Sequence, residues 1–304
     1  MRIVSLLPAT TEILCALGLE ERLVGRSHEC DYPESIRHLP VCTEPKFPLD
    51  DASAAVDRRI KTLVREGLSV YRVDADQLRS LNPQLVLTQN QCAACAADER
   101  QVADALYLWV DARPAMLSMS AQSLGDVWTD VTRIAAAAGA PERGAAMVAR
   151  LTARIDAIAA RARAIPVQST VACIEWLDPM MGAGNWMPEL VRAAGGVSLF
   201  GIAGQHSPWL HWASLVEQDP DIICLMPCGF TIDRTKKELE PLTTRPEWPR
   251  LKAVRERRVY LADGSAYFNR PGPRLVESVE MLAEMIHPTV FRFGHAGSGW
   301  ERLD

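Results

Sequence analysis

Short apolar runs alternate with segments of helical pattern along most of the chain. The apolar runs predict strands at residues 2–7, 22–27, 84–89, 116–119, 170–176, 221–226 and 258–263. The segments between them predict helices at residues 8–18, 53–67, 73–83, 99–109, 123–139, 141–165, 187–196, 213–220 and 271–288. Residues 289–304 are expected to form an irregular tail. Repeated strand–helix units are typical of parallel sheets covered by helices, so the sequence predicts an α/β fold.

The longest helical pattern covers residues 141–165, where Pro141 is well placed to begin the helix. Strand–helix units lie on both sides of it, which predicts two lobes joined by one long helix, with a ligand cleft between the lobes. We expect an N-terminal α/β lobe at 1–119, a helical connection at 120–165 and a C-terminal α/β lobe at 166–304.

Four of the eight cysteines follow predicted strands: Cys30, Cys92, Cys95 and Cys228. In open α/β folds the loops at the carboxyl ends of strands line the ligand crevice, so these thiols are expected to meet in one cleft. Together with His28, they form a candidate metal site. Four thiolates suit zinc or an iron–sulfur cluster.

Two other interpretations of the cysteines stay open. The C-x-x-C pair can be a redox dithiol at the start of a helix. Free cysteines can also be small buried hydrophobic residues, which fits Cys15, Cys173 and Cys224 because they lie within apolar patterns. Cys42 stays unassigned. Whether the protein is an enzyme is also open, since the sequence contains no nucleophile elbow, Walker loop, G-x-G-x-x-G or H-E-x-x-H motif.

Composition limits the kinds of partner and the cellular compartment that the sequence is compatible with. The net charge is −5 and no dense Lys/Arg cluster exists, which excludes a nucleic-acid footprint. The sequence contains no run of ~18 apolar residues, so no membrane span is predicted. The start of the sequence is predicted to be a strand rather than a signal peptide, and eight cysteines suit a reducing compartment. A cytoplasmic location is therefore expected, or a periplasmic one if the true start lies further upstream.

Several segments carry a family resemblance: RIVSLLPATTEILCALGLEERLVGRSHECDYP (2–33), LNPQLVLTQ (81–89), DPDIICL (219–225) and GAGNWMPELVRAAGG (182–196). They resemble the helical-backbone, or class III, solute-binding proteins, which capture cobalamin, ferric siderophores, haem or metal ions for ABC importers. The resemblance extends over about residues 2–288 and is strongest to the cobalamin-binding type. It implies two Rossmann-like lobes and a metal-containing ligand, such as a corrinoid, in the cleft between them.

The resemblance also implies where the ligand is held. In the segment 206–212, Trp209 or Trp212 is expected to stack on a flat macrocycle, and His206 and His211 are candidate axial ligands. The other candidate ligand-binding residues lie at predicted strand ends and helix starts. They are Thr10, Thr11, Glu175, Trp176, Trp186, Tyr267, Asn269 and Arg270.

The chain departs from this family in three respects: no export signal is seen, thiols line the expected cleft, and one docking residue differs. The family docks to its permease through an acidic residue on each lobe, and the matching positions here are Asp76 and Ala213, so docking to an ABC permease is doubtful. The leading hypothesis is a binding protein for a metal-containing ligand. The alternative is a cytosolic metalloprotein or enzyme with a Cys-ligated zinc or iron–sulfur centre. A third hypothesis is a conventional importer component whose true start, with a signal sequence, lies upstream of residue 1.

Overall fold

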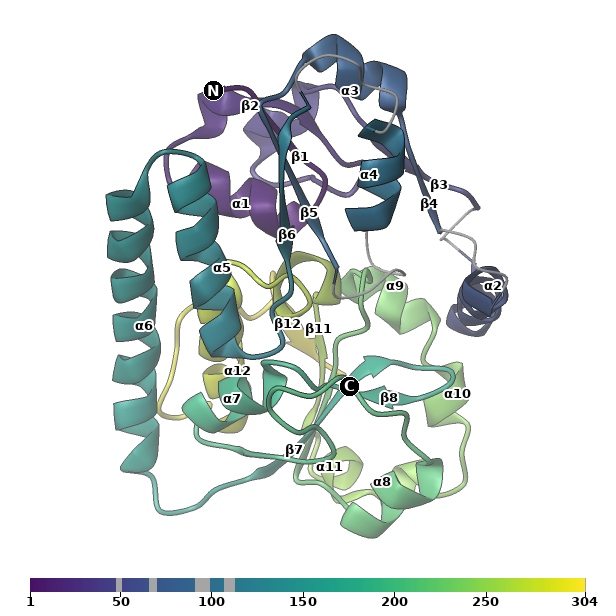
Figure 1. Ribbon diagram of the computed structural model, residues 1–304. Helices are drawn as coiled ribbons and strands as arrows, with labels where there is room; N and C mark the ends of the chain where they lie inside the picture. The colour runs from purple at the N-terminus through teal and green to yellow at the C-terminus, as the bar shows by residue number, and fades with distance from the viewer. Residues whose placement is uncertain (48–50, 66–69, 91–98, 107–112, 304) are drawn as a thin grey trace. The chain divides into compact units, whose positions relative to one another are not determined.

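The computed structural model describes residues 1–47, 51–65, 70–90, 99–106 and 113–303 (Figure 1). The chain divides into two compact units. Unit 1 comprises residues 1–51, 55–121 and 125–150, and unit 2 comprises residues 52–54, 122–124 and 151–304. The predicted α/β class is confirmed, because each unit has a largely parallel sheet with helices packed on it.

Unit 1 is built on a four-stranded parallel sheet in the order β2-β1-β5-β6, beside a small antiparallel β3–β4 pair. Its strands are β1 (Ile3–Ser5), β2 (Leu23–Arg26), β3 (Thr43–Pro45), β4 (Tyr71–Val73), β5 (Leu85–Gln89) and β6 (Ala115–Met119). The helices wholly or mainly in unit 1 are α1 (Pro8–Ala16), α2 (Ser53–Arg65), α3 (Ala75–Leu81), α4 (Glu99–Leu106) and α5 (Leu124–Ala137).

The apolar runs of unit 1 form strands because both of their faces are covered. Val4 and Val86 of the sheet pack with Leu78 of α3 and with Val102 of α4 in one buried cluster. Figure 1 shows α1 and α5 on the other side of this sheet from α3 and α4. Strands buried on both faces carry consecutive apolar residues rather than alternating ones, as at Leu85, Val86 and Leu87 of β5, which are all buried.

Unit 2 contains the sheet order β12-β11-β10-β7-β8, with β9 also paired to β7. Its strands are β7 (Thr170–Trp176), β8 (Met181–Gly182), β9 (Val197–Ser198), β10 (Ile222–Leu225), β11 (Val259–Ala262) and β12 (Trp300–Arg302). Its helices are α7 (Met187–Ala193), α8 (Trp212–Gln218), α9 (Ile232–Lys237), α10 (Glu240–Thr243), α11 (Lys252–Arg255) and α12 (Leu275–Ile286). The three strands β7, β10 and β11 are parallel neighbours, so their carboxyl ends lie at the same edge.

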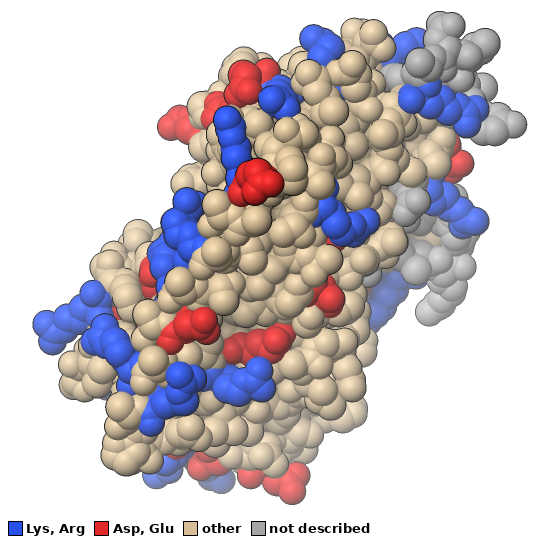
Figure 2. Space-filling model, turned by 60° about the vertical axis from the view of Figure 1, so that its left-hand side comes forward, with Lys and Arg blue, Asp and Glu red and all other residues tan. Residues whose placement is uncertain are grey.

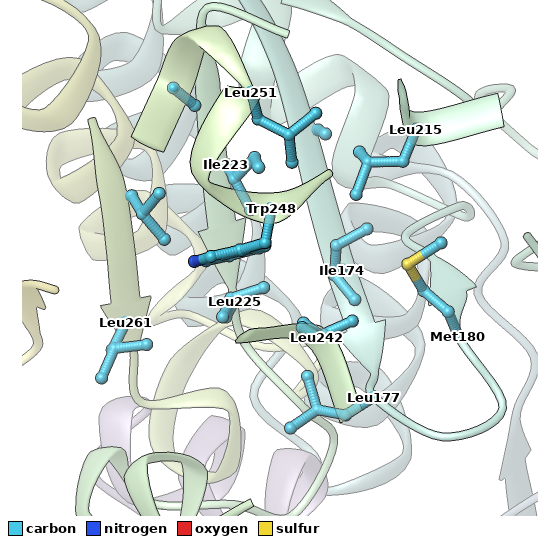
Figure 3. Packing of buried hydrophobic residues seen from close by; sticks show 13 residues of the cluster. Ile174, Leu177, Met180, Leu215, Ile223, Leu225, Leu242, Trp248, Leu251 and Leu261 are labelled. Atoms are coloured by element: carbon cyan, nitrogen blue, oxygen red, sulfur yellow. The ribbon is translucent and has the colours of Figure 1, made fainter. Parts of the chain in front are cut away.

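One face of the unit 2 sheet carries a large apolar cluster (Figure 3). Ile174, Ile223, Leu225 and Leu261 project from the strands, and the Trp248 ring lies over them. Because successive side chains of a strand point to opposite faces, the residues between these positions face the other way, toward α7 and α12.

Helix α6 (Pro141–Arg163) is the predicted long helix, and the boundary between the two units falls within it. Within unit 2, Arg154 of α6 pairs with two acids of α12, at 2.7 Å from Glu280 and 3.6 Å from Glu277. Such pairing agrees with the interspersed basic and acidic side chains on the face shown in Figure 2. None of the described helices is both long and apolar enough to cross a membrane.

The sequence missed several short elements. The tail prediction for 289–304 is wrong in part, because β12 pairs antiparallel with β11 and Trp300 packs edge-on against Tyr260 at 5.3 Å. The two- and three-residue strands β3, β4, β8 and β9 were also not predicted. Elements this short have too few side chains for a periodic pattern, so their tertiary partners decide their structure.

Candidate functional site

In unit 1, the carboxyl end of β1 meets the start of α1 in a buried network of hydroxyl and thiol groups. The hydroxyls of Thr10 and Thr11 lie 2.6 and 2.7 Å from Ser5 Oγ. The Thr11 hydroxyl also lies 3.1 Å from Cys30 Sγ, and the Cys30 thiol is 3.8 Å from the Ser5 carbonyl. All four residues are buried, so these groups connect β1, α1 and the loop after β2.

His28 lies in the same loop and is half-buried. Its Nδ1 is 2.9 Å from the Thr43 hydroxyl, and its ring is tilted against Tyr71 at 5.4 Å. Its Nε2 is buried and has no hydrogen-bond partner among the described residues. Burial lowers the pKa of His28, so the imidazole is neutral near pH 7, the form that binds metals.

Cys92 and Cys95, the C-x-x-C pair, lie outside the described residues. Cys228 lies in unit 2 as a half-buried free thiol in the loop after β10. Among the residues the structure describes, no three His, Cys, Asp or Glu side chains are grouped so that they could hold a metal ion. Neither the described part of the chain nor the comparisons below support a zinc or iron–sulfur centre.

The carboxyl edge of the unit 2 sheet consists of the loops that follow β7, β10 and β11, and these loops are fastened to each other. Asn269 Nδ2 donates to two carbonyls, those of Met226 and Gly264, each at 3.0 Å. The Ser265 amide donates to the Phe230 carbonyl at 3.1 Å. A Cβ atom on Gly264 would collide with the backbone of residues 226–227, so only glycine fits where the two loops cross.

Aromatic side chains cover part of this edge. Trp176, the last residue of β7, packs against Phe230 at 5.3 Å, and the Arg234 guanidinium lies 3.8 Å over the Phe230 ring. The neighbouring Glu175 is half-buried, and its carbonyl accepts from the Cys228 amide at 3.0 Å. Phe230 was not among the residues predicted for the site, although it lies in the same loop after β10 as Cys228.

Trp186, Tyr267 and Arg270 lie around the loop after β11. The buried Trp186 ring donates from Nε1 to the Phe268 carbonyl at 2.9 Å. Tyr267 is covered by the Arg274 guanidinium at 5.0 Å, and Arg270 is buried. The loop after β11 is therefore held by side-chain packing as well as by the Asn269 hydrogen bonds.

A second loop of unit 2, residues 204–210, runs alongside residues 180–185 and is fastened to them by backbone hydrogen bonds. Gly182 donates to the Pro208 carbonyl at 2.9 Å, and Leu210 donates to the Met180 carbonyl at 2.8 Å. Asn185 donates to the Gln205 carbonyl at 2.7 Å. We call residues 204–210 the presenting loop, because its backbone is fixed while several of its side chains point to solvent.

Two side chains of the presenting loop are exposed and chemically distinctive. Trp209 exposes 51% of its surface, which is unusual for so large an apolar side chain. His206 is exposed, and its Nδ1 lies 2.9 Å from the Ser207 carbonyl. Because a carbonyl only accepts, Nδ1 carries the proton in the neutral ring and the lone pair is on Nε2. His206 can therefore offer Nε2 to a metal.

Trp212 is in a different situation. Its Nε1 donates to Glu247 at 2.9 Å, its ring is stacked with Trp248 at 6.5 Å, and Arg245 lies 4.9 Å over it. The sequence left Trp209 and Trp212 as equal candidates for stacking on a ligand. The structure shows that Trp212 packs against the apolar cluster of unit 2, while Trp209 stays exposed. His211 is also exposed and precedes α8 as its N-cap.

The solved structures that share this fold include two binding proteins. A periplasmic heme-binding protein from Pseudomonas aeruginosa has a TM-score of 0.74 and 16% identity, covering 100% of this chain and 98% of that one. The periplasmic vitamin B12-binding protein BtuF of Vibrio cholerae has a TM-score of 0.66 and 18% identity, covering 93% and 95%. At these identities the likeness shows the two-lobed α/β fold alone.

A curated relative covers nearly the whole chain. The uncharacterized ABC transporter substrate-binding lipoprotein YvrC of Bacillus subtilis (strain 168) is 26% identical over 299 residues, 96% of this chain and 81% of the relative. The model of the family described as periplasmic binding protein matches residues 3–266.

These comparisons correct one expectation and settle the family. The cytoplasmic location is wrong, because the family is periplasmic and the Bacillus relative is a lipoprotein, both outside the cytoplasm. That expectation rested on the strand at the start of the chain and on the cysteines. A strand forms in the same way in either compartment, and a buried free cysteine such as Cys30 packs as a small hydrophobic residue in both. The chain belongs to the periplasmic binding protein family.

Proposed function

We propose that this solute-binding protein captures a flat metal chelate, a corrinoid or a haem, and delivers it to an ABC importer. Family membership supports a binding role over a catalytic one. Structurally similar proteins include a heme-binding and a vitamin B12-binding protein, which supports a chelate as the ligand. The Bacillus relative, named as an ABC transporter substrate-binding lipoprotein, supports an importer as the partner.

The observation that carries the proposal is the presenting loop. The exposed Trp209 ring offers a flat apolar face on which a macrocycle can stack. Three residues earlier, His206 offers an Nε2 lone pair, the donor that cobalt and iron accept as an axial ligand. The backbone bonds to residues 180–185 hold this loop before the ligand arrives, which lowers the entropy lost on binding.

The experiment is a titration of the full chain with hemin and, separately, with aquacobalamin. Binding is measured by quenching of tryptophan fluorescence and by the visible spectrum of the chelate. We expect His206→Ala to abolish the spectral change that reports imidazole ligation and to weaken binding by about tenfold or more. Trp209→Ala is expected to weaken binding by about tenfold while keeping that spectral change, since stacking contributes ~1–2 kcal/mol.

Two matched variants serve as controls. His38→Ala removes an exposed histidine of unit 1 whose Nδ1 also lies against a backbone carbonyl, that of Ser35, and Val167→Ala removes an exposed apolar side chain elsewhere in unit 2. Both should bind as the unchanged protein does. If neither chelate binds, the proposed ligand class is wrong. If a chelate binds equally well to the His206→Ala and Trp209→Ala variants, the ligand does not use the presenting loop.

Transfer to a permease is the second part of the proposal. Asp76 is exposed in the first turn of α3, and Ala213 is exposed in the first turn of α8. An exposed carboxylate suits a basic pocket on a membrane partner, whereas Ala213 supplies only a small contact. We therefore expect Asp76→Asn to weaken docking to a reconstituted importer. Ala213→Asp should strengthen docking if the second position is also used.

A further inference from the structure

Two cysteines lie side by side in the centre of the unit 2 sheet. Cys173 of β7 and Cys224 of β10 are register partners on adjacent parallel strands. Both are free thiols and both are buried. They are distinct from Cys228, which lies beyond the end of β10 and is half-buried.

Their side chains lie on the same face of the sheet. Residues on either side of them, such as Ala172, Ile174, Ile223 and Leu225, belong to the apolar cluster of Figure 3. By alternation, Cys173 and Cys224 point to the opposite face, together. Adjacent strands are ~4.8 Å apart, which is within the Cα separation that a disulfide spans.

The two thiols already contact each other. A hydrogen bond in which the Cys224 thiol donates to Cys173, together with burial, raises the pKa of Cys224 well above its usual value. In the folded dithiol, little thiolate is therefore present near pH 7, and the folded protein should oxidise slowly. Oxidation is expected while the sheet is assembling, when the thiols are still accessible.

We propose that Cys173 and Cys224 form a disulfide that joins β7 to β10 when the chain folds in an oxidising compartment. The family of this chain is periplasmic, and the periplasm is such a compartment. The inference is independent of the proposed ligand.

The oxidant is a disulfide, either of a small thiol or of a thiol–disulfide oxidoreductase. One cysteine loses its proton and attacks a sulfur of that disulfide, which forms a mixed disulfide and releases one thiol. The second cysteine, also deprotonated, attacks the mixed disulfide at the protein sulfur and releases the second thiol. Two protein thiols are oxidised and one external disulfide is reduced to two thiols, so atoms and electrons balance.

The bond would stabilise the part of the protein that supports the ligand loops. Trp176 ends β7 and Cys228 follows β10, so both strands lead directly into the carboxyl edge of unit 2. Closing the loop of chain between Cys173 and Cys224 should shift the unfolding equilibrium toward the folded state, on the order of a thousandfold in the chain-entropy model.

The test is refolding of the full chain from denaturant, once with reduced and oxidised glutathione together and once with reduced glutathione alone. Remaining thiols are alkylated under denaturing conditions, and the peptides are mapped by mass spectrometry. We expect a cross-linked peptide pair containing Cys173 and Cys224 in the first sample alone. We also expect that sample to unfold at a higher urea concentration than the reduced one.

Cys228→Ser is the matched variant, because it removes a cysteine of the same unit and leaves the proposed pair intact. It should show the same cross-link and the same difference in urea midpoint. Alkylation of both Cys173 and Cys224 after oxidative refolding would overturn the proposal, as would a cross-link from either of them to Cys228 instead. A Cys173–Cys224 disulfide with no rise in the urea midpoint would refute its stabilising role. Mapping of the unchanged chain decides the pairing without any core variant.

Discussion

Asn269 was predicted from sequence to bind a ligand. In the structure, its side chain links the loop after β10 to the loop after β11 by hydrogen bonds. Both hydrogens of its amide are used, one on the Met226 carbonyl and one on the Gly264 carbonyl, each at 3.0 Å. Replacing Asn269 by Ala removes both bonds. Each bond contributes about 1 kcal/mol, and each carbonyl left in a buried position costs about 1 kcal/mol or more, so we expect a loss of about 2–4 kcal/mol.

Asn269→Asp removes the same two hydrogen bonds without removing the side chain. The side chain keeps its shape, but a carboxylate has no hydrogen to donate and faces two carbonyl oxygens. We expect a loss of stability at least as large as for Ala. Gln218→Ala, at the exposed end of α8, is the control and should change the free energy of unfolding by less than about 0.5 kcal/mol.

The assay is urea unfolding followed by circular dichroism, combined with amide hydrogen exchange. The amides of Phe230 and Ser265 lie in the two fastened loops, where they donate to Pro227 and Phe230. Their exchange should become faster in both Asn269 variants, while exchange in β1 of unit 1 stays unchanged. If the Ala and Asp variants are both as stable as the unchanged chain and exchange at the same rate, Asn269 does not fasten these loops.

Two further outcomes follow from the same unit. Gly264→Ala should destabilise the fold by about 3 kcal/mol or more, because the new Cβ would collide with the Pro227 carbonyl. Gly229→Ala should cost only about 1 kcal/mol of left-handed backbone strain, because a Cβ at that position would contact no other atom. Urea unfolding measures the free energy of unfolding of both variants. Burial raises the pKa of Asp221, but the hydrogen bond from Lys252 and a backbone amide more than offset this, so the pKa lies below its usual value. The stability gained from this depressed pKa is present above about pH 4 and is lost as the pH falls through the folded-state pKa. The difference in urea midpoint between the unchanged chain and Asp221→Asn should therefore shrink between pH 7 and pH 3.

The main strands and helices could be predicted because their signal is local. The run TVACIEW forms β7 at the predicted residues, and the pattern from Pro141 onward forms α6. The segment between β10 and β11 gave no prediction, although it forms α9, α10 and α11. These helices have four to six residues and begin around prolines and charged residues, so their existence depends on packing such as that of Trp248 on the sheet.

The candidate site was harder to predict, because its key properties depend on contacts between distant residues. The sequence showed that His206 and Trp209 are near each other, but not that Ser207 fixes the proton of the imidazole or that Trp209 is exposed. The sequence analysis named Thr10 and Cys30 as candidate site residues just as it named Trp209. Their burial in the network around Ser5 depends on the pairing of β1 with β2, which no local pattern reports.

In unit 2, the residues that stabilise the carboxyl edge of the sheet are different from the exposed residues of the presenting loop. Asn269, Trp186 and Gly264 hold the carboxyl edge of the sheet together, so changes there should affect stability first. The presenting loop is attached mainly through backbone hydrogen bonds to residues 180–185, which any side chains at its exposed positions would leave intact. Its exposed residues can therefore vary with little cost to the fold. A protein with this architecture can change the chelate it selects by exchanging the residues at positions 206 and 209 while the sheet and its fastened loops stay the same.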